Sequence, residues 1–140
     1  MCIRDRSLTH GGSGPIVTDG QWHFAVWVIN GANSKIYLDG EHVSTFNPSF
    51  SSVSEIATIG ALNVGTGAMN GNIDEVAFWN TTLTDDAIFS LYSAQNANFT
   101  ELSSSWTPKW DNIVGYWKMD GNLQDSSGNG NHGISTRISG

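Results

Sequence analysis

The segment Gly71-Asn-Ile-Asp-Glu-Val-Ala-Phe-Trp-Asn80, followed by Thr81-Thr-Leu-Thr-Asp-Asp-Ala-Ile-Phe-Ser-Leu-Tyr92, joins a predicted strand to a predicted helix. Side chains alternate along a strand, so Asp74 and Glu75 are expected to point to opposite faces. Whichever face is buried, one carboxylate is buried with it. Such a carboxylate must be hydrogen-bonded, paired or bound to a metal, because leaving it bare costs several kcal/mol.

The predicted helix covers about residues 84–94 and is recognised by its N-terminus. Thr84 can act as the N-cap, and two aspartates follow it in the first turn, where negative charge is favourable. Leu83, just before the cap, can pack on Ile88 as a hydrophobic staple. These signals predict a short amphipathic helix directly after the strand.

Two further segments predict strands of a common sheet. Residues 21–30 are apolar on both faces, which is typical of a central strand. Residues 35–43 predict a hairpin, because Asp39-Gly40 suits a type I′ turn in which both central residues have positive φ. The sequence therefore predicts a series of hairpins packed around residues 71–92.

Composition agrees with a single all-β domain. The 140 residues include sixteen glycines and six tryptophans, and only 14% are charged, which describes a turn-rich β protein. The formal net charge of −7 argues against nucleic acid or an anionic membrane as a partner and leaves room for a cation. No apolar run approaches the roughly 20 residues of a membrane helix, so membrane insertion is not expected.

Residues 71–92 contain a glycine-led Ile-Asp-Glu-Val strand, an aromatic pair and an acidic helix start. This combination resembles the closing part of laminin-G-like domains of the concanavalin A-like lectin/glucanase superfamily. Asp19-Gly-Gln-Trp-His23 is similar to the start of an earlier strand of that domain, and residues 35–43 to its hairpin. The resemblance implies an antiparallel β-sandwich of jelly-roll type with one short helix. It also implies that Trp22 belongs to the core.

The C-terminal segment resembles the beginning of such a domain. Ile113-Val-Gly-Tyr-Trp-Lys-Met119 is similar to its first strand, so closing elements precede opening elements in this chain. We therefore expect the end of one repeat joined to the start of the next. The predicted parts are residues 14–95 as the later part of a sandwich, 96–111 as a linker, and 112–140 as the opening strand and loop of a repeat.

The predicted strand at 113–119 has an apolar face that needs a core. We expect it to fold back onto the sandwich, pair with residues 73–79 and bury Trp117 and Met119, which is worth about 2 to 3 kcal/mol for each side chain. This gain exceeds the modest closure entropy of the intervening linker.

The first six residues, Met1-Cys-Ile-Arg-Asp-Arg6, resemble the translation of a sequencing-library adaptor. Residues 1–13 are accordingly predicted to be non-native or disordered, and deleting 1–6 is expected to leave stability unchanged. From Ser7 onward the chain has no cysteine, so disulfides are expected to play no part.

A calcium site is one of two hypotheses for the loop Asp125-Ser-Ser-Gly-Asn-Gly130. The loop does not make a complete EF-hand, since Thr136 stands where the closing glutamate belongs, but its oxygen-bearing residues can join carboxylates of the opening segment. The candidate ligands are Asp74, Glu75, Asp120, Asp125 and Asn129. The alternative is a turn in which Asp125 accepts hydrogen bonds from the amides of residues 126–128.

Four tryptophans not assigned to the core are candidates for stacking on a sugar: Trp27, Trp79, Trp106 and Trp110. Trp106 and Trp110 have polar surroundings, and the alternative is that they pin the linker to the sandwich. For each of the four taken singly, packing in the core is the favoured role.

Catalysis is not expected. Retaining glycosidases hold two carboxylates about 5 Å apart, whereas adjacent Asp74 and Glu75 are expected to point to opposite faces. We therefore interpret the chain as a non-catalytic module that binds a glycan or protein ligand within a larger, repeat-bearing extracellular or cell-surface protein. The alternative is a structural spacer of an adhesin, and a glycoside hydrolase fragment is less favoured.

Overall fold

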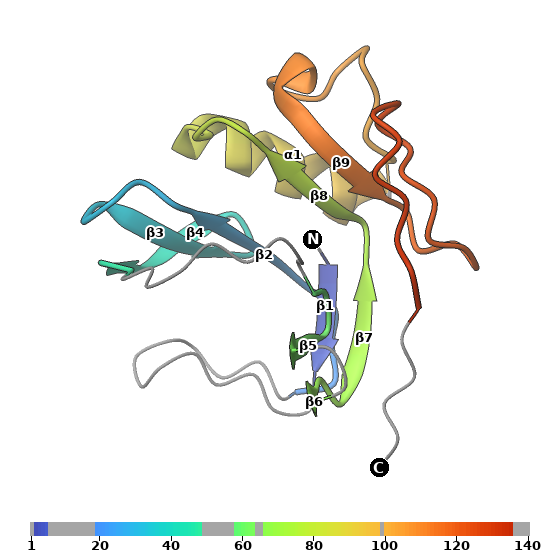
Figure 1. Cartoon of the computed structure of the whole chain (residues 1–140). Coiled ribbons are helices and arrows are strands. Elements are labelled where there is room, and N and C mark those ends of the chain that lie inside the picture. The colour runs from blue at the N-terminus through green and yellow to red at the C-terminus, as the bar shows by residue number, and fades with distance from the viewer. Residues whose placement is uncertain (1, 6–18, 49–57, 64–65, 99, 136–140) are drawn as a thin grey trace.

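The computed structural model describes residues 2–5, 19–48, 58–63, 66–98 and 100–135, which form antiparallel strands and one α-helix (Figure 1). The strands are β1 (Cys2–Asp5), β2 (His23–Val28), β3 (Ser34–Leu38), β4 (Glu41–Phe46), β5 (Ala61–Asn63), β6 (Thr66–Ala68), β7 (Gly71–Asp74), β8 (Val76–Trp79) and β9 (Ile113–Trp117). The helices are α1 (Asp85–Asn98) and a single 3-10 turn at Trp110–Asn112.

One sheet dominates the structure. Its five strands run in the order β4-β3-β2-β1-β7, and two further ladders pair β5 with β6 and β8 with β9. β2 is the middle strand, as its two apolar faces predicted. Mostly antiparallel strands and one helix are compatible with the predicted fold class, but the described residues do not form a complete sandwich of two facing sheets. No helix among them has the length and apolarity to span a membrane.

The hairpin between β3 and β4 forms at the predicted turn. Asp39 and Gly40 have φ of 51° and 83°, as a type I′ turn requires. A side chain at Gly40 would also come within 2.7 Å of the Tyr92 ring on α1, so glycine is needed for contact as well as for conformation. Next to the turn Leu38 pairs with Glu41 and Tyr37 with His42, and a register shift then places Ile36 opposite Ser44.

The helix begins as predicted and ends later. The Thr84 hydroxyl accepts a hydrogen bond from the Ala87 amide at 3.2 Å, which confirms the N-cap. Leu83 and Ile88 are both buried in the main core cluster, as expected of a staple. α1 continues to Asn98, so the first residues of the predicted linker are helical.

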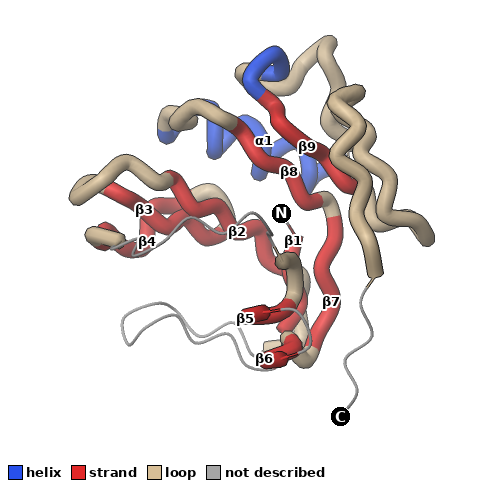
Figure 2. Tube along the Cα trace, viewed as in Figure 1, coloured by secondary structure: helices blue, strands red, loops and turns tan. Residues whose placement is uncertain are grey.

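The single strand predicted over residues 73–79 is wrong, because the chain divides it at Glu75. This residue has φ of 53°, a value that ordinary strand residues do not adopt. β7 joins the large sheet before the break, and β8 pairs with β9 after it (Figure 2). One continuous segment thereby connects the two sheets.

The C-terminal strand pairs with this segment as expected. β9 runs antiparallel to β8, with Val76 opposite Trp117 and Ala77 opposite Tyr116. The predicted burial of Trp117 and Met119 is wrong, because both are half-buried and Trp117 packs edge-on against the exposed Phe78. The fully buried residue is Tyr116. A register shift between Phe78 and Trp79 breaks the simple alternation on which the prediction rested.

The core lies between β2, β3, α1 and β9. Its buried cluster consists of Phe24, Tyr37, Leu83, Ile88, Leu91, Leu102, Ile113 and Tyr116. The predicted linker 96–111 contributes to it, because Leu102 is buried and Trp106 and Trp110 pack against the cluster. This segment is therefore part of the folded body.

The predicted detachment of the N-terminus is wrong for residues 2–5. They form β1, which pairs antiparallel with β2 on one side and with β7 on the other. Strand pairing uses backbone groups that every non-proline residue carries, so an unrelated origin of the peptide does not prevent insertion. Residues 1 and 6–13 of the predicted segment lie outside the described residues.

Deleting residues 1–6 is expected to lower the melting temperature by several degrees, because β2 and β7 each lose a neighbouring strand. A thermal melt followed by circular dichroism measures this. The matched control replaces Cys2–Asp5 by four β-branched residues, which keeps the ladder and is expected to preserve the melting temperature. An unchanged melting temperature on deletion would show that β1 contributes nothing to stability.

Candidate functional site

A cleft of about 330 Å³ opens where β2 begins, beside the junction of β7 and β8. Three aromatic residues, Trp22, Phe24 and Tyr92, line it, and of these Trp22 is the exposed one. The charged part of its wall consists of Asp39, Asp74, Glu75, Glu101 and Asp120 together with His23. An exposed aromatic surface beside many hydrogen-bonding groups is the chemistry expected of a binding site for a polar ligand.

The sequence predicts Trp22 to be a core residue, and this prediction is wrong. Its side chain remains 47% exposed. The reason is that β2 starts only at His23, so Trp22 belongs to the preceding turn, and the first buried residue of the strand is Phe24. The sequence therefore singles out Trp22, but it predicts a buried position for a side chain that is exposed.

The break in the strand at Glu75 gathers three of the predicted metal ligands at the cleft: Asp74, Glu75 and Asp120. The Glu75 carboxylate accepts a hydrogen bond from the Tyr116 hydroxyl, and Asp74 accepts one from the Glu75 amide at 3.1 Å. Neither carboxylate of the pair is fully buried as predicted: Asp74 and Glu75 are both half-buried, because the break at Glu75 interrupts the alternation of strand faces, and the partner of Glu75 is a tyrosine from β9.

The electrostatics of this group disfavour full ionisation. Burial raises the pKa of Glu75; the Tyr116 hydrogen bond opposes the rise, and repulsion from Asp74, Glu101 and Asp120 adds to it. Burial also raises the pKa of Asp74, with a contribution from Asp120. The cleft therefore holds carboxylates whose negative charges are only partly compensated by the protein.

Asp125 lies in a different environment, and the structure shows the hydrogen-bonded turn. One carboxylate oxygen accepts hydrogen bonds from the amides of Ser127 and Tyr116 at 2.8 and 2.9 Å, and the other accepts from Asn131 at 2.9 Å. Of the three amides predicted, only that of Ser127 is a partner. Burial alone raises the pKa of Asp125, but these hydrogen bonds outweigh it and lower the pKa to about 2.

The five predicted calcium ligands do not form one site. The Asn129 side-chain amide donates to the carbonyls of Ile113 and Val114, so it helps to fix the loop against β9 as Asp125 does. Asp125 and Asn129 are not among the residues that line the cleft. Within the described part of the chain, no three His, Cys, Asp or Glu side chains are placed to hold a metal ion. The structure therefore does not bring the five predicted calcium ligands together, because Asp125 and Asn129 fix the loop against β9 instead.

Three of the four candidate tryptophans pack against the core: Trp79, Trp106 and Trp110. The Trp79 indole donates to the Pro108 carbonyl at 3.1 Å, and that of Trp106 to the Glu101 carbonyl at 2.9 Å. Trp27 is half-buried and lines a second, mainly apolar cleft of about 450 Å³ between β2 and β8. None of the four lines the Trp22 cleft.

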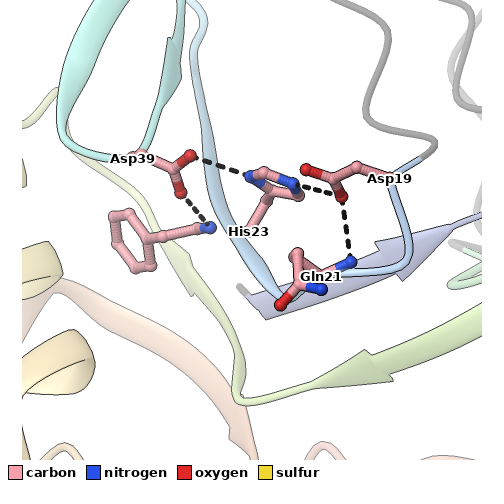
Figure 3. A network of polar contacts seen from close by, with 5 residues as sticks. Asp19, Gln21, His23 and Asp39 are labelled. Carbon is pink, nitrogen blue, oxygen red and sulfur yellow. Dashed lines mark hydrogen bonds and ion pairs between the residues drawn. The ribbon is translucent and has the colours of Figure 1, made fainter.

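A polar network beside the cleft is not evident from the sequence. His23 contacts Asp39 through Nδ1 at 2.8 Å and Asp19 through Nε2 at 3.0 Å (Figure 3). Asp39 also accepts the Phe24 amide at 3.0 Å, and Asp19 accepts the Gln21 amide at 2.9 Å. The separation of Asp19 and His23 by four residues is visible in the sequence, but the approach of Asp39 depends on the hairpin turn.

Comparison with known proteins identifies a family. The family model Laminin_G_3, described as concanavalin A-like lectin/glucanases superfamily, matches residues 5–89. No curated protein and no solved structure matches the chain. The matched region contains Trp22, His23, Asp39 and the Asp74–Glu75 pair, whereas Glu101 and Asp120 lie beyond it.

Glu75→Gln is expected to raise the melting temperature at neutral pH. Glutamine still accepts the Tyr116 hydrogen bond and removes a charge that burial and three neighbouring carboxylates disfavour. Because the folded-state pKa of Glu75 lies above its ordinary value of 4.5, the wild type loses stability as pH rises through that pKa, and the gain of the variant disappears below about pH 4.5. Melting curves at several pH values measure it. The exposed Glu41→Gln is the control, and a less stable Glu75→Gln at neutral pH would contradict the argument.

Asp125→Asn is expected to destabilise the chain by roughly 2 kcal/mol, because an amide group cannot accept all three backbone hydrogen bonds. Since the folded-state pKa is lowered to about 2, this stabilisation is present above the ordinary value of 3.8 and is lost as pH falls toward 2.

The same variant tests calcium. The difference in free energy of unfolding between the wild type and Asp125→Asn is expected to be the same in excess calcium and in chelator, as measured by chemical denaturation. The exposed Asp111→Asn serves as the control. A loss that appears only with calcium would show that Asp125 is a metal ligand after all.

Proposed function

Because the chain belongs to the laminin-G-like family of the concanavalin A-like lectin/glucanase superfamily, we propose that it is a non-catalytic recognition module that binds a glycan in the Trp22 cleft. The observation that carries this proposal is the 47% exposure of Trp22 at the wall of a cleft rich in polar groups. The cleft volume of about 330 Å³ falls within the range of small-molecule sites and suits a short saccharide.

The residues of the cleft provide both kinds of contact that a sugar requires. The apolar C–H face of a pyranose packs on an aromatic ring, here Trp22. Its hydroxyls donate hydrogen bonds to carboxylates such as Asp74 and Asp120, and these bonds are stronger than neutral ones because the acceptor is charged. A rigid aromatic side chain and acceptors on a folded frame keep the entropy cost of binding low.

The negative charge of the cleft wall disfavours anionic ligands. The cleft wall contains five carboxylates and one histidine, and the whole chain has a formal net charge of −7. Sulfated or uronic acid glycans would be repelled by this surface. The proposed ligand is therefore a neutral glycan.

We propose a binding role in place of hydrolysis because the carboxylates near Trp22 are engaged in structure. Glu75 is held by Tyr116, and Asp74 accepts the Glu75 amide. In this proposal the module belongs to a larger extracellular or cell-surface protein with neighbouring repeats, where glycans are accessible. A spacer that binds nothing is the second candidate, favoured by the packing of three candidate tryptophans in the core.

Trp22→Ala is expected to weaken glycan binding about tenfold or more through loss of the stacking surface. A glycan array that includes neutral and sulfated saccharides identifies the ligand, and calorimetry with the best neutral saccharide gives the affinity. Phe89→Ala removes another exposed aromatic residue, on α1 and outside the cleft, and is expected to bind like the wild type.

Three outcomes contradict the proposal in different ways. Absence of binding by the wild type favours the spacer. Preferential binding of sulfated saccharides refutes the ligand class. Release of reducing sugar from the bound saccharide refutes the non-catalytic role.

A further inference from the structure

The contacts of His23 can exist together in only one protonation state. Both ring nitrogens face a carboxylate, Nδ1 toward Asp39 and Nε2 toward Asp19 (Figure 3). Ionised carboxylates only accept hydrogen bonds, and a neutral imidazole donates from only one nitrogen. The observed arrangement therefore requires a doubly protonated, positively charged ring.

The surroundings support that state. Partial burial works against the charge of His23, but hydrogen bonds from the ring to Asp39 and Asp19 outweigh it and raise the pKa above its ordinary value of 6.5. The Gln21 amide and the His23 ring in turn lower the pKa of Asp19, which keeps that carboxylate ionised. The ring therefore keeps its charge to a higher pH than a free imidazole does and loses it as the pH rises further.

Loss of one proton removes one of the two contacts, and the structure indicates which. Asp39 is the more buried carboxylate, with its side chain 37% exposed against 57% for Asp19. It is also fixed by the hairpin turn and by the Phe24 amide. The neutral ring therefore keeps its proton on Nδ1 toward Asp39, and the contact between Nε2 and Asp19 is lost.

The lost contact is the one that orders the turn carrying Trp22. The same Asp19 oxygen accepts from the Gln21 amide and contacts His23 Nε2, so residues on both sides of Trp22 are anchored to one atom. We propose that His23 positions Trp22 in the cleft while the ring is doubly protonated and releases the Asp19 turn when the ring becomes neutral. The cleft then has an ordered aromatic wall only below the pH at which His23 titrates.

Other charges near His23 do not replace this contact. On β1, the backbone of Ile3 pairs with that of His23. On β3, Lys35 forms its ion pair with Asp85 of α1. The remaining charged groups of the cleft are all carboxylates: Asp74, Glu75, Glu101 and Asp120. None of them forms a hydrogen bond or ion pair with the His23 ring, so none takes the place of Asp19 at Nε2.

An NMR titration of the full chain without ligand tests the proposal. The indole N–H of Trp22 and the ring of His23 are followed from about pH 6 to about pH 9. The two signals are expected to change with one midpoint, above 6.5. In Asp19→Asn the midpoint is expected to fall and the Trp22 change to shrink. His42→Gln removes an exposed histidine outside the cleft and is expected to leave both signals unaffected.

A Trp22 signal that does not move while His23 titrates would overturn the proposal, as would an unchanged midpoint in Asp19→Asn. The direct variant His23→Gln removes both ring contacts and can fail to fold. Asp19 is exposed, so Asp19→Asn is expected to fold in either case.

A second arm, which rests on the proposed function, compares the affinity for the best neutral saccharide of the array at the two ends of this range. Binding is expected to be about threefold to tenfold weaker at the alkaline end, and the difference is expected to disappear in Asp19→Asn. Equal affinity at both ends would refute control of binding by His23. If no saccharide binds at either pH, the glycan function fails, and the Trp22 signal alone decides whether His23 positions that residue.

Discussion

The hydrogen bond from Tyr116 to Glu75 is the contact on which the arrangement of the chain depends. Tyr116 is fully buried, and its hydroxyl also accepts the Leu102 amide at 3.3 Å, while its own amide donates to Asp125. One residue of β9 thereby joins the break between β7 and β8, the connection after α1 and the C-terminal loop. Without this partner, Glu75 would be a half-buried carboxylate with no side-chain hydrogen bond, which costs free energy.

The position of the cleft follows from the same contact. Glu75 has a left-handed backbone, so β7 continues into the large sheet while β8 turns toward β9. The wall of the cleft is built where these directions separate, with Asp74 and Glu75 on one side and Trp22 at the start of β2. A cleft at the junction of two sheets needs no special loop, because the divergence of the strands leaves the space.

The sequence predicted what local chemistry determines. The Asp39-Gly40 turn and the Thr84 cap are specified by one or two residues and formed where expected. Pairing of β9 with β8 was also predictable, since only one core was available to its apolar face. The break at Glu75 was not, because it depends on Tyr116, which lies 41 residues away. The insertion of β1 was missed for a different reason: Cys2–Asp5 lacks the alternation of apolar and polar residues that predicts a strand, and its pairing rests on backbone groups.

The carboxylates of this structure are of two kinds, which differ in their hydrogen bonds and in the direction of their pKa shifts. Asp125 receives three backbone hydrogen bonds and its pKa falls to about 2, so its charge is used to fix the loop. Glu75 has one hydroxyl partner, Asp74 accepts one amide, and both have raised pKa values beside Asp120. Stability alone would favour neutral side chains at these positions. Under the proposed function, the hydroxyls of a bound glycan would supply further hydrogen bonds to these carboxylates, which line the same cleft as the exposed Trp22.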